Sequence, residues 1–401
     1  MKIELPEKVQ QIIKTLQKAG YEAYAVGGCV RDSLLVRTPK DWDITTSAKP
    51  QEIKSLFRRT VDTGILHGTV TVMLGRDGFE VTTYRVDGAY EDNRHPKNVT
   101  FTSSLEEDLK RRDFTINAMA YNDETGLVDL FDGMGDIQRK CIRAVGDPDE
   151  RFSEDALRIL RALRFAAQLD YRIDTKTEKG IRAYRENLRD ISAERIRDEL
   201  HKLLASPHPE RLRDVCAAGI TEIVLNEYDA LDKDKQDEVC KALQNTDDIL
   251  IRLAILLCYT GSAKQILKRL KYDNETIRIV TTLTEHAMDK PAAELPAVRH
   301  LIVETGTGLI GPLLELKRAL AKQDKAYLDS LEVLTRQIFT NGDCLSLKDL
   351  AVTGNDLMRE FDMRPGKELG DTLRGLFDRV LIDPSLNDRE KLLALVRNER
   401  E

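Results

Sequence analysis

The stretch Gly27-Gly28-Cys29-Val30-Arg31-Asp32, followed by Asp41-Trp42-Asp43, decides how this 401-residue chain is organised. A glycine pair that follows a short apolar run, residues 23–26, lets backbone amides approach a phosphate group closely. Two carboxylates that are two residues apart project from one face of an extended strand, because side chains alternate along a strand. The pattern predicts a metal-dependent phosphoryl-transfer site.

Asp41 and Asp43 are the candidate catalytic metal ligands of this site. Two-metal phosphoryl transfer needs carboxylates that hold Mg²⁺ ions about 4 Å apart. Glu80, in a hairpin expected to face them, is the candidate third acidic group, although an exposed strand glutamate explains it equally well. Aspartate pairs of this spacing are also common in turns and helix caps. The preceding glycine pair and Arg31 favour the phosphoryl-transfer interpretation.

Composition favours a helix-rich protein with two or more domains, since charged residues make up 33% of the chain and aromatic residues 5%. The N-terminus lacks an apolar signal segment, and the apolar run 249–259 is too short to span a bilayer and contains Arg252. We therefore expect a cytoplasmic protein without a membrane partner. Six cysteines lie far apart without a CxxC pair, which disfavours a zinc site or a disulfide framework: Cys29, Cys141, Cys216, Cys240, Cys258 and Cys344.

The net charge of −7 is unevenly distributed. Residues 1–138 hold 18 Lys and Arg against 22 Asp and Glu, residues 139–213 hold 18 against 14, and residues 214–401 hold 26 against 33. A basic segment thus joins two acidic ones. We expect phosphate-rich ligands to bind at this basic segment.

Hydrophobic periodicity predicts a small mixed α/β domain over about the first 140 residues, followed by helices. The predicted elements of the domain are a helix that begins near Pro6 and ends at Gly20, a strand through Val26, a short helix with Arg31, a strand over 42–46 with both aspartates, a helix over 50–57 and a hairpin of 69–74 and 79–84 around 76–78. Ser153 is the expected N-cap of a helix with Glu154 and Asp155 in its first turn. Later helices are expected around 196–204, 249–258, 313–320, 327–339 and 373–382.

Six ordered motifs resemble those of the eubacterial-type tRNA nucleotidyltransferases, the CCA-adding enzymes, whose family includes bacterial poly(A) polymerases. They are GGCVRD at 27–32, KDWDITT at 40–46, HGTV at 67–70, EVTTYR at 80–85, RRDFTINAMAY at 111–121 and EDALRILRALRF at 154–165. The resemblance continues through RIRDEL at 195–200 and, more weakly, through 353–373. It implies an α+β fold: a polymerase-beta-like nucleotidyltransferase head at 1–140, a helical neck with a base-recognition helix at 141–213, a helical body at 214–335 and a helical tRNA-binding tail at 336–401.

The resemblance also implies a reaction and the residues that perform it. The expected enzyme adds or repairs the 3′-terminal CCA of tRNA with CTP and ATP, needs Mg²⁺, releases pyrophosphate, and holds the acceptor arm and elbow of the tRNA. The matched residues are Asp41 and Asp43 for the metal, Gly27, Gly28 and Arg31 for the triphosphate, Arg112 and Asp113 for the nucleotide and ribose, Asp155 and Arg158 for the base, and Arg161 and Arg164 for further nucleotide contacts. The stretch Arg94-His95-Pro96 matches a flexible loop that the family uses to pass from C to A addition.

Asp155 and Arg158 can also be interpreted without the family. Residues three apart on a helix are neighbours on one face, so this pair can present a hydrogen-bond acceptor beside donors. Cytosine and adenine share an edge with an exocyclic amine next to an unprotonated ring nitrogen. Uracil and guanine would face the pair with apposed acceptors and apposed donors, and unpaired buried polar groups make such discrimination steep. The alternative for this pair is an ordinary surface ion pair.

Two other functions remain open at this stage. An A-adding or poly(A)-polymerising relative shares the head motifs, and loop residues 86–98 carry most of the discrimination from such relatives. A non-catalytic RNA-binding protein built on a decayed head would be expected to lose one aspartate, whereas both Asp41 and Asp43 are present. The oligomeric state does not follow from the sequence.

Overall fold

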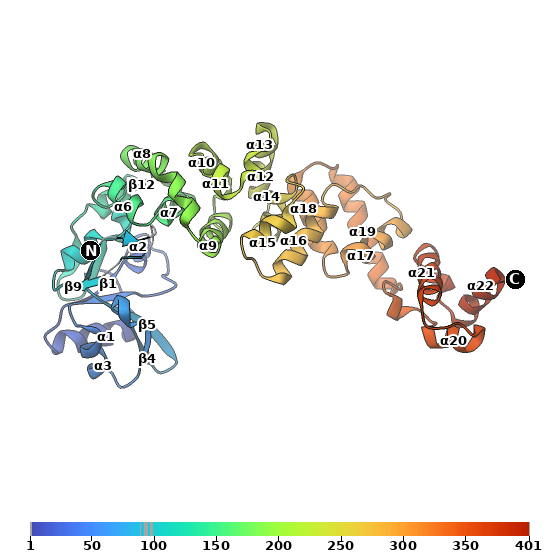
Figure 1. Cartoon of the computed structure of the whole chain (residues 1–401), viewed down its shortest axis with the longest axis horizontal. Coiled ribbons are helices and arrows are strands. Elements are labelled where there is room, and N and C mark those ends of the chain that lie inside the picture. Colours follow the sequence, from blue (N-terminus) through green and yellow to red (C-terminus); the bar gives the residue numbers. More distant parts are fainter. Residues whose placement is uncertain (1, 89, 92–94, 97–98, 401) are drawn as a thin grey trace. The chain divides into compact units, whose positions relative to one another are not determined.

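The computed structural model describes residues 2–88, 90–91, 95–96 and 99–400 of the chain (Figure 1). The chain divides into two compact units, Met1–Ala230 and Leu231–Glu401. Within the described residues, every strand belongs to the first unit and the second unit is helical. The α+β fold class expected from the sequence is confirmed. The finer division into head, neck, body and tail stays a prediction.

A seven-stranded mixed sheet forms the centre of the first unit. Its strands follow the order β11-β10-β1-β2-β5-β4-β3, and only β2 and β5 pair in parallel. The strands are β1 (Ala23–Val26), β2 (Ile44–Thr46), β3 (Thr60–Gly64), β4 (Thr69–Leu74), β5 (Asp77–Thr83), β10 (Met119–Asn122) and β11 (Gly126–Asp129). Ile44 lies opposite Ala25 on one side and Val81 on the other, so the start of β2 sits in the middle of the sheet.

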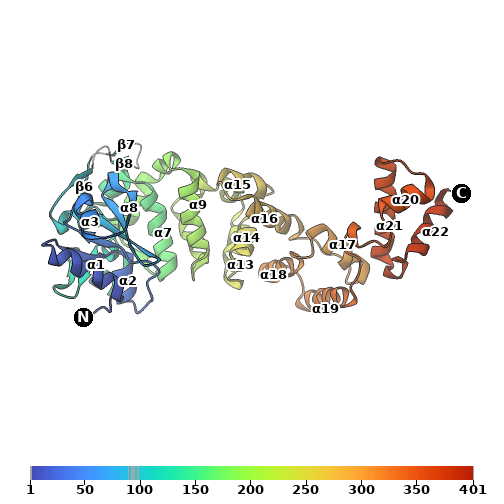
Figure 2. The same ribbon diagram turned by 90° about the horizontal axis from the view of Figure 1, so that it is seen from below.

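Helices bury both faces of β1. The helices of this region are α1 (Glu7–Lys18), α2 (Gly28–Leu34), α3 (Pro50–Leu56), α4 (Leu105–Lys110) and α5 (Gly133–Gln138). Figure 1 and Figure 2 show α1 and α3 side by side, and their apolar residues join Ala23 and Ala25 in one buried cluster. Tyr24 and Val26 point to a second cluster with Leu109 of α4. The period-two alternation of a strand accounts for this division.

Short elements connect the larger ones. The remaining strands of the first unit form pairs: β6 (Arg85–Asp87) with β9 (Val99–Phe101), β7 (Tyr90–Glu91) with β8 (His95–Pro96), and β12 (Cys141–Ile142) with β13 (Arg172–Ile173). The 3₁₀ helices of the chain are η1 (Ile65–His67), η2 (Thr115–Asn117), η3 (Arg185–Asp190), η4 (Pro209–Arg211), η5 (Leu243–Asn245), η6 (Leu347–Asp349) and η7 (Pro384–Leu386).

Helices continue the first unit beyond β12. They are α6 (Pro148–Glu154), α7 (Leu157–Leu169), α8 (Thr175–Tyr184), α9 (Ala193–Leu204), α10 (Leu212–Ala217), α11 (Thr221–Val224) and α12 (Asn226–Asp229). Helix α7 is buried along most of its length, including its arginines Arg158 and Arg164, and it packs against α9. Because buried arginines need partners, this helix organises the polar contacts described below.

Three sequence predictions about local structure are wrong in detail. The strand predicted over 42–46 begins only at Ile44, so Asp41 and Asp43 precede it. The hairpin turns at Gly75 and Arg76 rather than at 76–78, because β5 begins at Asp77. Ser153 caps no helix: it lies inside α6, which Asp147 caps through its side chain.

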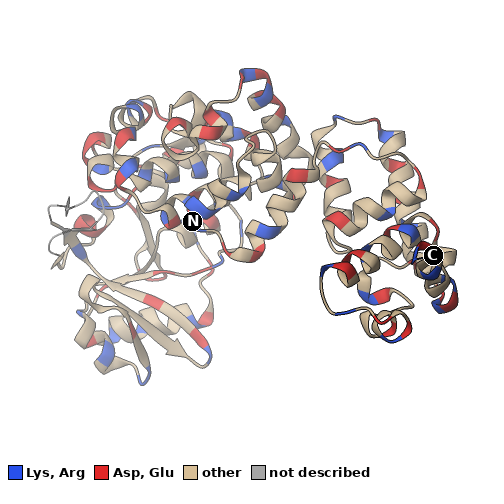
Figure 3. Cartoon of the chain, turned by 45° about the vertical axis from the view of Figure 1, so that its right-hand side comes forward, with Lys and Arg blue, Asp and Glu red and all other residues tan. Residues whose placement is uncertain are grey.

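The second unit contains ten helices within its described residues: α13 (Lys233–Ala242), α14 (Ile249–Leu257), α15 (Ala263–Arg269), α16 (Asn274–His286), α17 (Leu295–Thr305), α18 (Ile310–Leu320), α19 (Lys325–Asn341), α20 (Gly354–Phe361), α21 (Lys367–Ile382) and α22 (Arg389–Arg400). Residues of both signs alternate along the helices nearest the C-terminus (Figure 3). Lys317 is buried and donates to the backbone carbonyls of His286, Ala287 and Asp289, which ties α18 to the end of α16. Across the described residues, each helix is too short or too polar to cross a bilayer.

Candidate active site

The glycine turn between β1 and α2 brings two arginines together. Gly27 has φ +83°, which favours glycine, and a Cβ at this position would lie 3.2 Å from Arg112 Nη1. A Cβ at Gly28 would lie 3.7 Å from Arg31 Nη2. The buried Arg31 donates from Nη1 to Asn117 Oδ1 at 2.6 Å. Arg31, which is near the turn in sequence, and Arg112, which is distant from it, therefore both lie beside the glycine turn.

Asp43 and Glu80 line one cavity of about 170 Å³ on the sheet. The backbone carbonyl of Asp43 accepts from the amide of Val26 at 3.0 Å, which extends the pairing of β1 with the segment before β2. Glu80 enters from β5, where it lies opposite Thr71 of β4. The other lining residues are Val26, Ile44, Thr69, Thr82, Arg85, Arg111 and Arg112.

The three candidate carboxylates interact electrostatically. Desolvation raises the pKa of Asp43; the charge of Arg112 acts against this, and that of Asp41 adds to it. Desolvation also raises the pKa of Glu80, followed by the charges of Asp43 and Asp41. Within the described chain, none of the three carboxylates forms an ion pair with Lys or Arg. Their negative charge is therefore available to a cation.

The donor set fits Mg²⁺ at two carboxylates. Oxygen ligands suit this ion, which proteins usually bind through one or two carboxylates and the phosphates of a substrate. Asp41 and Asp43 supply such a pair. A closed protein cage is not present: the described residues contain no group of three or more His, Cys, Asp or Glu arranged to hold a metal. The role of Glu80 as a third acidic group stays a prediction.

Asp108 of α4 forms ion pairs with Arg111 and Arg112, two residues that line the cavity of Asp43 and Glu80. It is fully buried and accepts from Arg111 Nε and Nη2 at 3.0 and 2.8 Å, from Arg112 Nη2 at 3.2 Å and from Thr45 Oγ1 at 3.1 Å. Burial opposes the charged form, but Arg112 and Arg111 outweigh it and lower the pKa of Asp108. Arg112 Nε is buried with no hydrogen-bond partner among the described residues. A buried unpaired donor of this kind is what an anionic ligand would satisfy.

Asp113 and Arg161 are paired, although they lie in different elements. Arg161 donates from Nε and Nη2 to Asp113 Oδ2 at 2.8 and 2.6 Å. Asp113 Oδ1 accepts from Asn117 Nδ2 and from the Phe114 amide. Burial alone would raise the pKa of Asp113; the charge of Arg161 and these hydrogen bonds lower it to about 2. Asp113 therefore stays ionised and fixes the guanidinium of Arg161.

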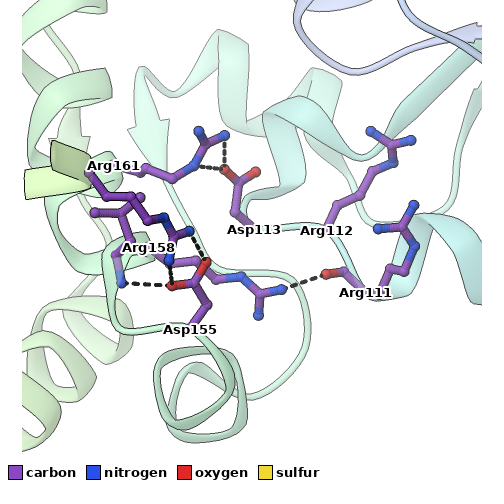
Figure 4. Close-up of a pocket in the computed structure, with 8 residues that line it drawn as sticks. Arg111, Arg112, Asp113, Asp155, Arg158 and Arg161 are labelled. Atoms are coloured by element: carbon purple, nitrogen blue, oxygen red, sulfur yellow. Dashed lines mark hydrogen bonds and ion pairs between the residues drawn. The ribbon is translucent and has the colours of Figure 1, made fainter. Parts of the chain in front are cut away.

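Asp155 lies between two helices instead of inside one. It has extended backbone angles at the end of α6, and its Oδ1 accepts from the Leu157 amide at 3.0 Å, at the beginning of α7. Both of its carboxylate oxygens also accept from Arg195 of α9, at 3.3 and 2.8 Å (Figure 4). The expected single helix with Asp155 and Arg158 on one face is therefore wrong. Asp155 instead forms an ion pair with Arg195 of α9.

The side chain of Arg158 nevertheless lines the same cavity as Asp155. Its Nη1 donates to Glu154 Oε2 at 2.5 Å and to the Arg151 carbonyl at 3.0 Å, and its Nη2 donates to the Arg111 carbonyl at 3.0 Å. The cavity measures about 250 Å³ and is lined by Arg111, Arg112, Asp113, Asp155, Leu157, Arg158, Arg161 and Arg195 (Figure 4). Arg111 and Arg112 line both cavities. The cavity of Asp43 and Glu80 and the cavity of Asp155 and Arg158 therefore meet at one shared wall.

Other candidates lie at the edge of this arrangement. Neither cavity is lined by Gly27, Gly28, Arg31, Asp41 or Arg164. Arg164 is buried and donates from Nε to Glu199 Oε2 at 2.5 Å. In the stretch 94–96, His95 and Pro96 form β8, while Arg94 lies outside the described residues.

Three family models together match most of the chain. The family described as "Poly A polymerase head domain" matches residues 23–143, "Probable RNA and SrmB- binding site of polymerase A" matches residues 170–231, and "tRNA nucleotidyltransferase domain 2 putative" matches residues 241–396. The CCA-adding enzyme of Pediococcus pentosaceus is 38% identical over 97% of this chain and 97% of its own. The chain belongs to the family of CCA-adding enzymes.

Further relatives agree with this membership. The CCA-adding enzyme of Levilactobacillus brevis is 39% identical over 98% of both chains. A crystal structure of the Bacillus stearothermophilus CCA-adding enzyme in complex with CTP has a TM-score of 0.84 and 30% identity, over 99% of this chain and 98% of that one. The resemblance that the motifs indicated is confirmed, and so is the enzyme class, a nucleotidyltransferase of the CCA-adding family.

Several residues of this CCA-adding enzyme site were not singled out from the sequence. Asn117, Arg195 and Glu199 hold the candidate arginines and aspartates through hydrogen bonds between distant elements, and Asp108 holds Arg112 from four residues away. Arg195 and Glu199 lie in the RIRDEL motif at 195–200, which was the one available signal for them. Asp108 is surrounded by other charged residues in the sequence, and nothing there distinguishes it from a solvated helix aspartate.

Proposed function

We propose that this chain adds or repairs the 3′-terminal CCA of tRNA without a nucleic-acid template, taking CTP and ATP and releasing pyrophosphate. Full-length kinship with CCA-adding enzymes supports the reaction. The observation that carries the proposed site is the shared wall of Arg111 and Arg112, which lies between the cavity of Asp43 and Glu80 and the cavity of Asp155 and Arg158. One nucleoside triphosphate can extend across that wall with its phosphates in one cavity and its base in the other.

Mg²⁺ would be held by Asp41 and Asp43. When bound, such an ion neutralises triphosphate charge and favours ionisation of an attacking hydroxyl. The 3′ oxygen of the RNA forms a bond with the α-phosphorus, the bond from that phosphorus to the β-phosphate oxygen breaks, pyrophosphate leaves and the hydroxyl proton passes to solvent. Arg112, with its unpaired buried Nε, and Arg31 would bind the phosphates. Glu80 would contribute negative charge beside the two aspartates.

Base selection is proposed to come from Asp155 and Arg158. A carboxylate has about four acceptor sites, so Asp155 can accept from the amine of cytosine or adenine while it stays paired with Arg195. Arg158, which is held by Glu154 and two backbone carbonyls, is proposed to donate to the ring nitrogen. Asp113 and Arg161 are proposed to bind the ribose and nucleotide, and Arg164 to support them.

The tRNA partner is proposed to lie along the basic segment 139–213, where Lys and Arg outnumber Asp and Glu by 18 to 14. Phosphate contacts fix the position of an RNA without reading its sequence, and an A-form arm is recognised largely by shape. The expected complex therefore weakens as salt is added. Residues 336–401 are proposed to contact the tRNA elbow.

The reaction is tested by supplying purified protein and Mg²⁺ with tRNAs that end before CCA, after C, or after CC, with CTP and ATP offered separately. The full CCA reaction predicts C addition to the first two and A addition to the third. Extension of only the CC-ended tRNA would replace it by A-only addition, and long A tails would indicate a poly(A) polymerase. The variants Asp41→Asn and Asp43→Asn should abolish extension, while Asp77→Asn, an exposed head aspartate paired with Lys8, should not. No extension by the unsubstituted protein would contradict the proposal.

A further inference from the structure

A single buried phenylalanine lies beneath three of the candidate arginines. Phe165, near the end of α7, is 4% exposed. The guanidinium carbons of Arg164, Arg31 and Arg161 lie 3.9, 4.9 and 5.4 Å from the centre of its ring. These distances fall within the range of cation–π attraction, which strengthens when the groups are removed from water.

The three arginines come from two separate parts of the chain. Arg31 belongs to α2 beside the glycine turn, whereas Arg161 and Arg164 belong to α7. Each has a carboxylate partner: Asp32 for Arg31, Asp113 for Arg161 and Glu199 for Arg164. None of those carboxylates is shared between α2 and α7 in these contacts. Asn117 and Asp113 link Arg31 to Arg161 through hydrogen bonds. The ring of Phe165 in addition lies against guanidinium groups from both helices.

An aromatic ring is chemically suited to hold several guanidinium groups near one another. Guanidinium groups that crowd together repel one another, and the pKa of Arg164 is lowered by desolvation and, further, by the charge of Arg161. The carboxylate partners offset part of this repulsion through N–H donors of the guanidinium groups. The face of an aromatic ring adds attraction to the cations without occupying any further N–H donor.

The orientation of the ring is itself fixed. Phe114 packs edge-on against Phe165, with ring centres 5.8 Å apart and planes at 82°. Phe114 is fully buried and pairs through its backbone with Ala144. Its neighbour Asp113 holds Arg161, so the same short segment positions both the ring and one of the cations above it.

We propose that Phe165 is a positioning residue, whose ring keeps Arg31 in register with Arg161 and Arg164, so that Arg31 and Arg161 act on one bound nucleoside triphosphate while Arg164 supports Arg161. This inference rests on the proposed function. It predicts that weakening the ring face lowers affinity for CTP and ATP alike. Preference for these nucleotides over UTP and GTP should not change, because base choice is proposed to come from Asp155 and Arg158, which are held by Arg195 and Glu154.

The test replaces Phe165 by 4-fluoro-, 3,5-difluoro- and 3,4,5-trifluorophenylalanine, which keep the ring shape and progressively weaken the charge of its face. Equilibrium dialysis of full-length protein should show the Kd for CTP and for ATP rising with each step, by about tenfold at the trifluoro stage. The same series at Phe152, a fully buried residue of α6 without a cation over its ring among the described residues, is the matched control and should leave both Kd values unchanged.

Constant affinity across the Phe165 series, or an equal rise in the Phe152 series, would overturn the inference. A change in the preference for CTP over UTP would also overturn it. The tRNA extension assay reports separately on the proposed function. Stepwise loss of nucleotide affinity without tRNA extension supports the role of Phe165 and contradicts CCA addition. Extension of tRNA together with an unchanged Kd across the fluorinated series supports CCA addition and contradicts the role of Phe165.

Discussion

Both carboxylate oxygens of Asp155 accept hydrogen bonds from Arg195, which lies 40 residues further along the chain. The pair fixes an acceptor at the gap between α6 and α7 and places it in the cavity that Arg158 also lines. The geometry of the proposed base-reading pair thus depends on α9 as well as on the motif at 154–165.

Replacing Asp155 with alanine should reduce nucleotide selectivity. Loss of the acceptor removes the penalty that uracil and guanine meet, so the ratio of kcat/KM for CTP over UTP should fall by about 10- to 100-fold. Metal-dependent transfer itself should persist. Single-nucleotide extension of tRNA with each of the four nucleotides measures the ratio. Asp149→Ala, an exposed change in α6, is the control, and unchanged selectivity in Asp155→Ala would contradict protein-directed base choice.

Arg195→Met should act through the same carboxylate. We expect a smaller loss of selectivity than in Asp155→Ala, because the acceptor remains but loses its orientation. In the double variant the two effects should not add, since both remove one interaction. Additive effects on the CTP-to-UTP ratio would show that Arg195 acts independently of Asp155.

Asp108→Asn should destabilise the first unit and weaken catalysis together. The substitution removes a buried charge that Arg111 and Arg112 both contact, and breaking a buried ion pair costs about 3–5 kcal/mol. Urea unfolding followed by circular dichroism should show a lower midpoint, and the KM for both nucleotides should rise. Asp132→Asn, which removes an exposed partner of Arg139, should leave the midpoint and KM as they are. Equal behaviour of the two variants would contradict the role assigned to Asp108.

Much of the fold was predictable because it is recorded in local patterns. The apolar spacing of Val9, Ile12 and Leu16 predicted α1, and the glycine pair predicted the turn before α2. Later helices such as α9, α14 and α18 also occur near their expected positions. Periodicity of this kind reports which face is buried, and it needs no knowledge of distant residues.

The break at Asp155 shows what local patterns cannot provide. The apolar series from Ala156 to Leu163 continues without interruption past a plausible Ser153 cap, so the sequence indicates one helix. The actual boundary depends on Asp147, which caps α6, and on Arg195, which holds Asp155 from another helix. Asp108 with Thr45 and Phe165 with Arg31 are likewise contacts between distant elements, and no spacing in the sequence announces them.

The pH dependence of stability should report on Asp113. Its pKa in the folded protein, about 2, is lower than in an unfolded chain, so ionised Asp113 stabilises the fold above about pH 4 and this contribution is lost as pH falls towards 2. The contribution is about 2 kcal/mol. Urea midpoints measured between pH 5 and pH 2.5 should fall less steeply for Asp113→Asn than for the unsubstituted protein. Parallel curves would contradict the charge pairing with Arg161.

Affinity for tRNA should fall as the salt concentration rises, and residues of the basic segment 139–213 should account for part of this salt dependence. Lys176 and Lys179 of α8 are exposed, and neither forms an ion pair with a described residue. Changing both to glutamine should reduce the slope of log Kd against log salt by up to about 2. Filter binding at several salt concentrations measures it. The matched change of Lys14 and Lys18 in α1 removes equal charge elsewhere; if it lowered the slope as much, the basic segment would have no special role.

One nucleoside triphosphate is proposed to span the wall formed by Arg111 and Arg112. A crystal structure of the protein with Mg²⁺ and a non-reactive CTP analogue would test this binding mode. We expect the α-phosphate beside Asp41 and Asp43, the cytosine amine within hydrogen-bond distance of Asp155, and the ring nitrogen facing Arg158. A cytosine bound outside the cavity of Asp155 and Arg158, or a triphosphate remote from the two aspartates, would contradict it.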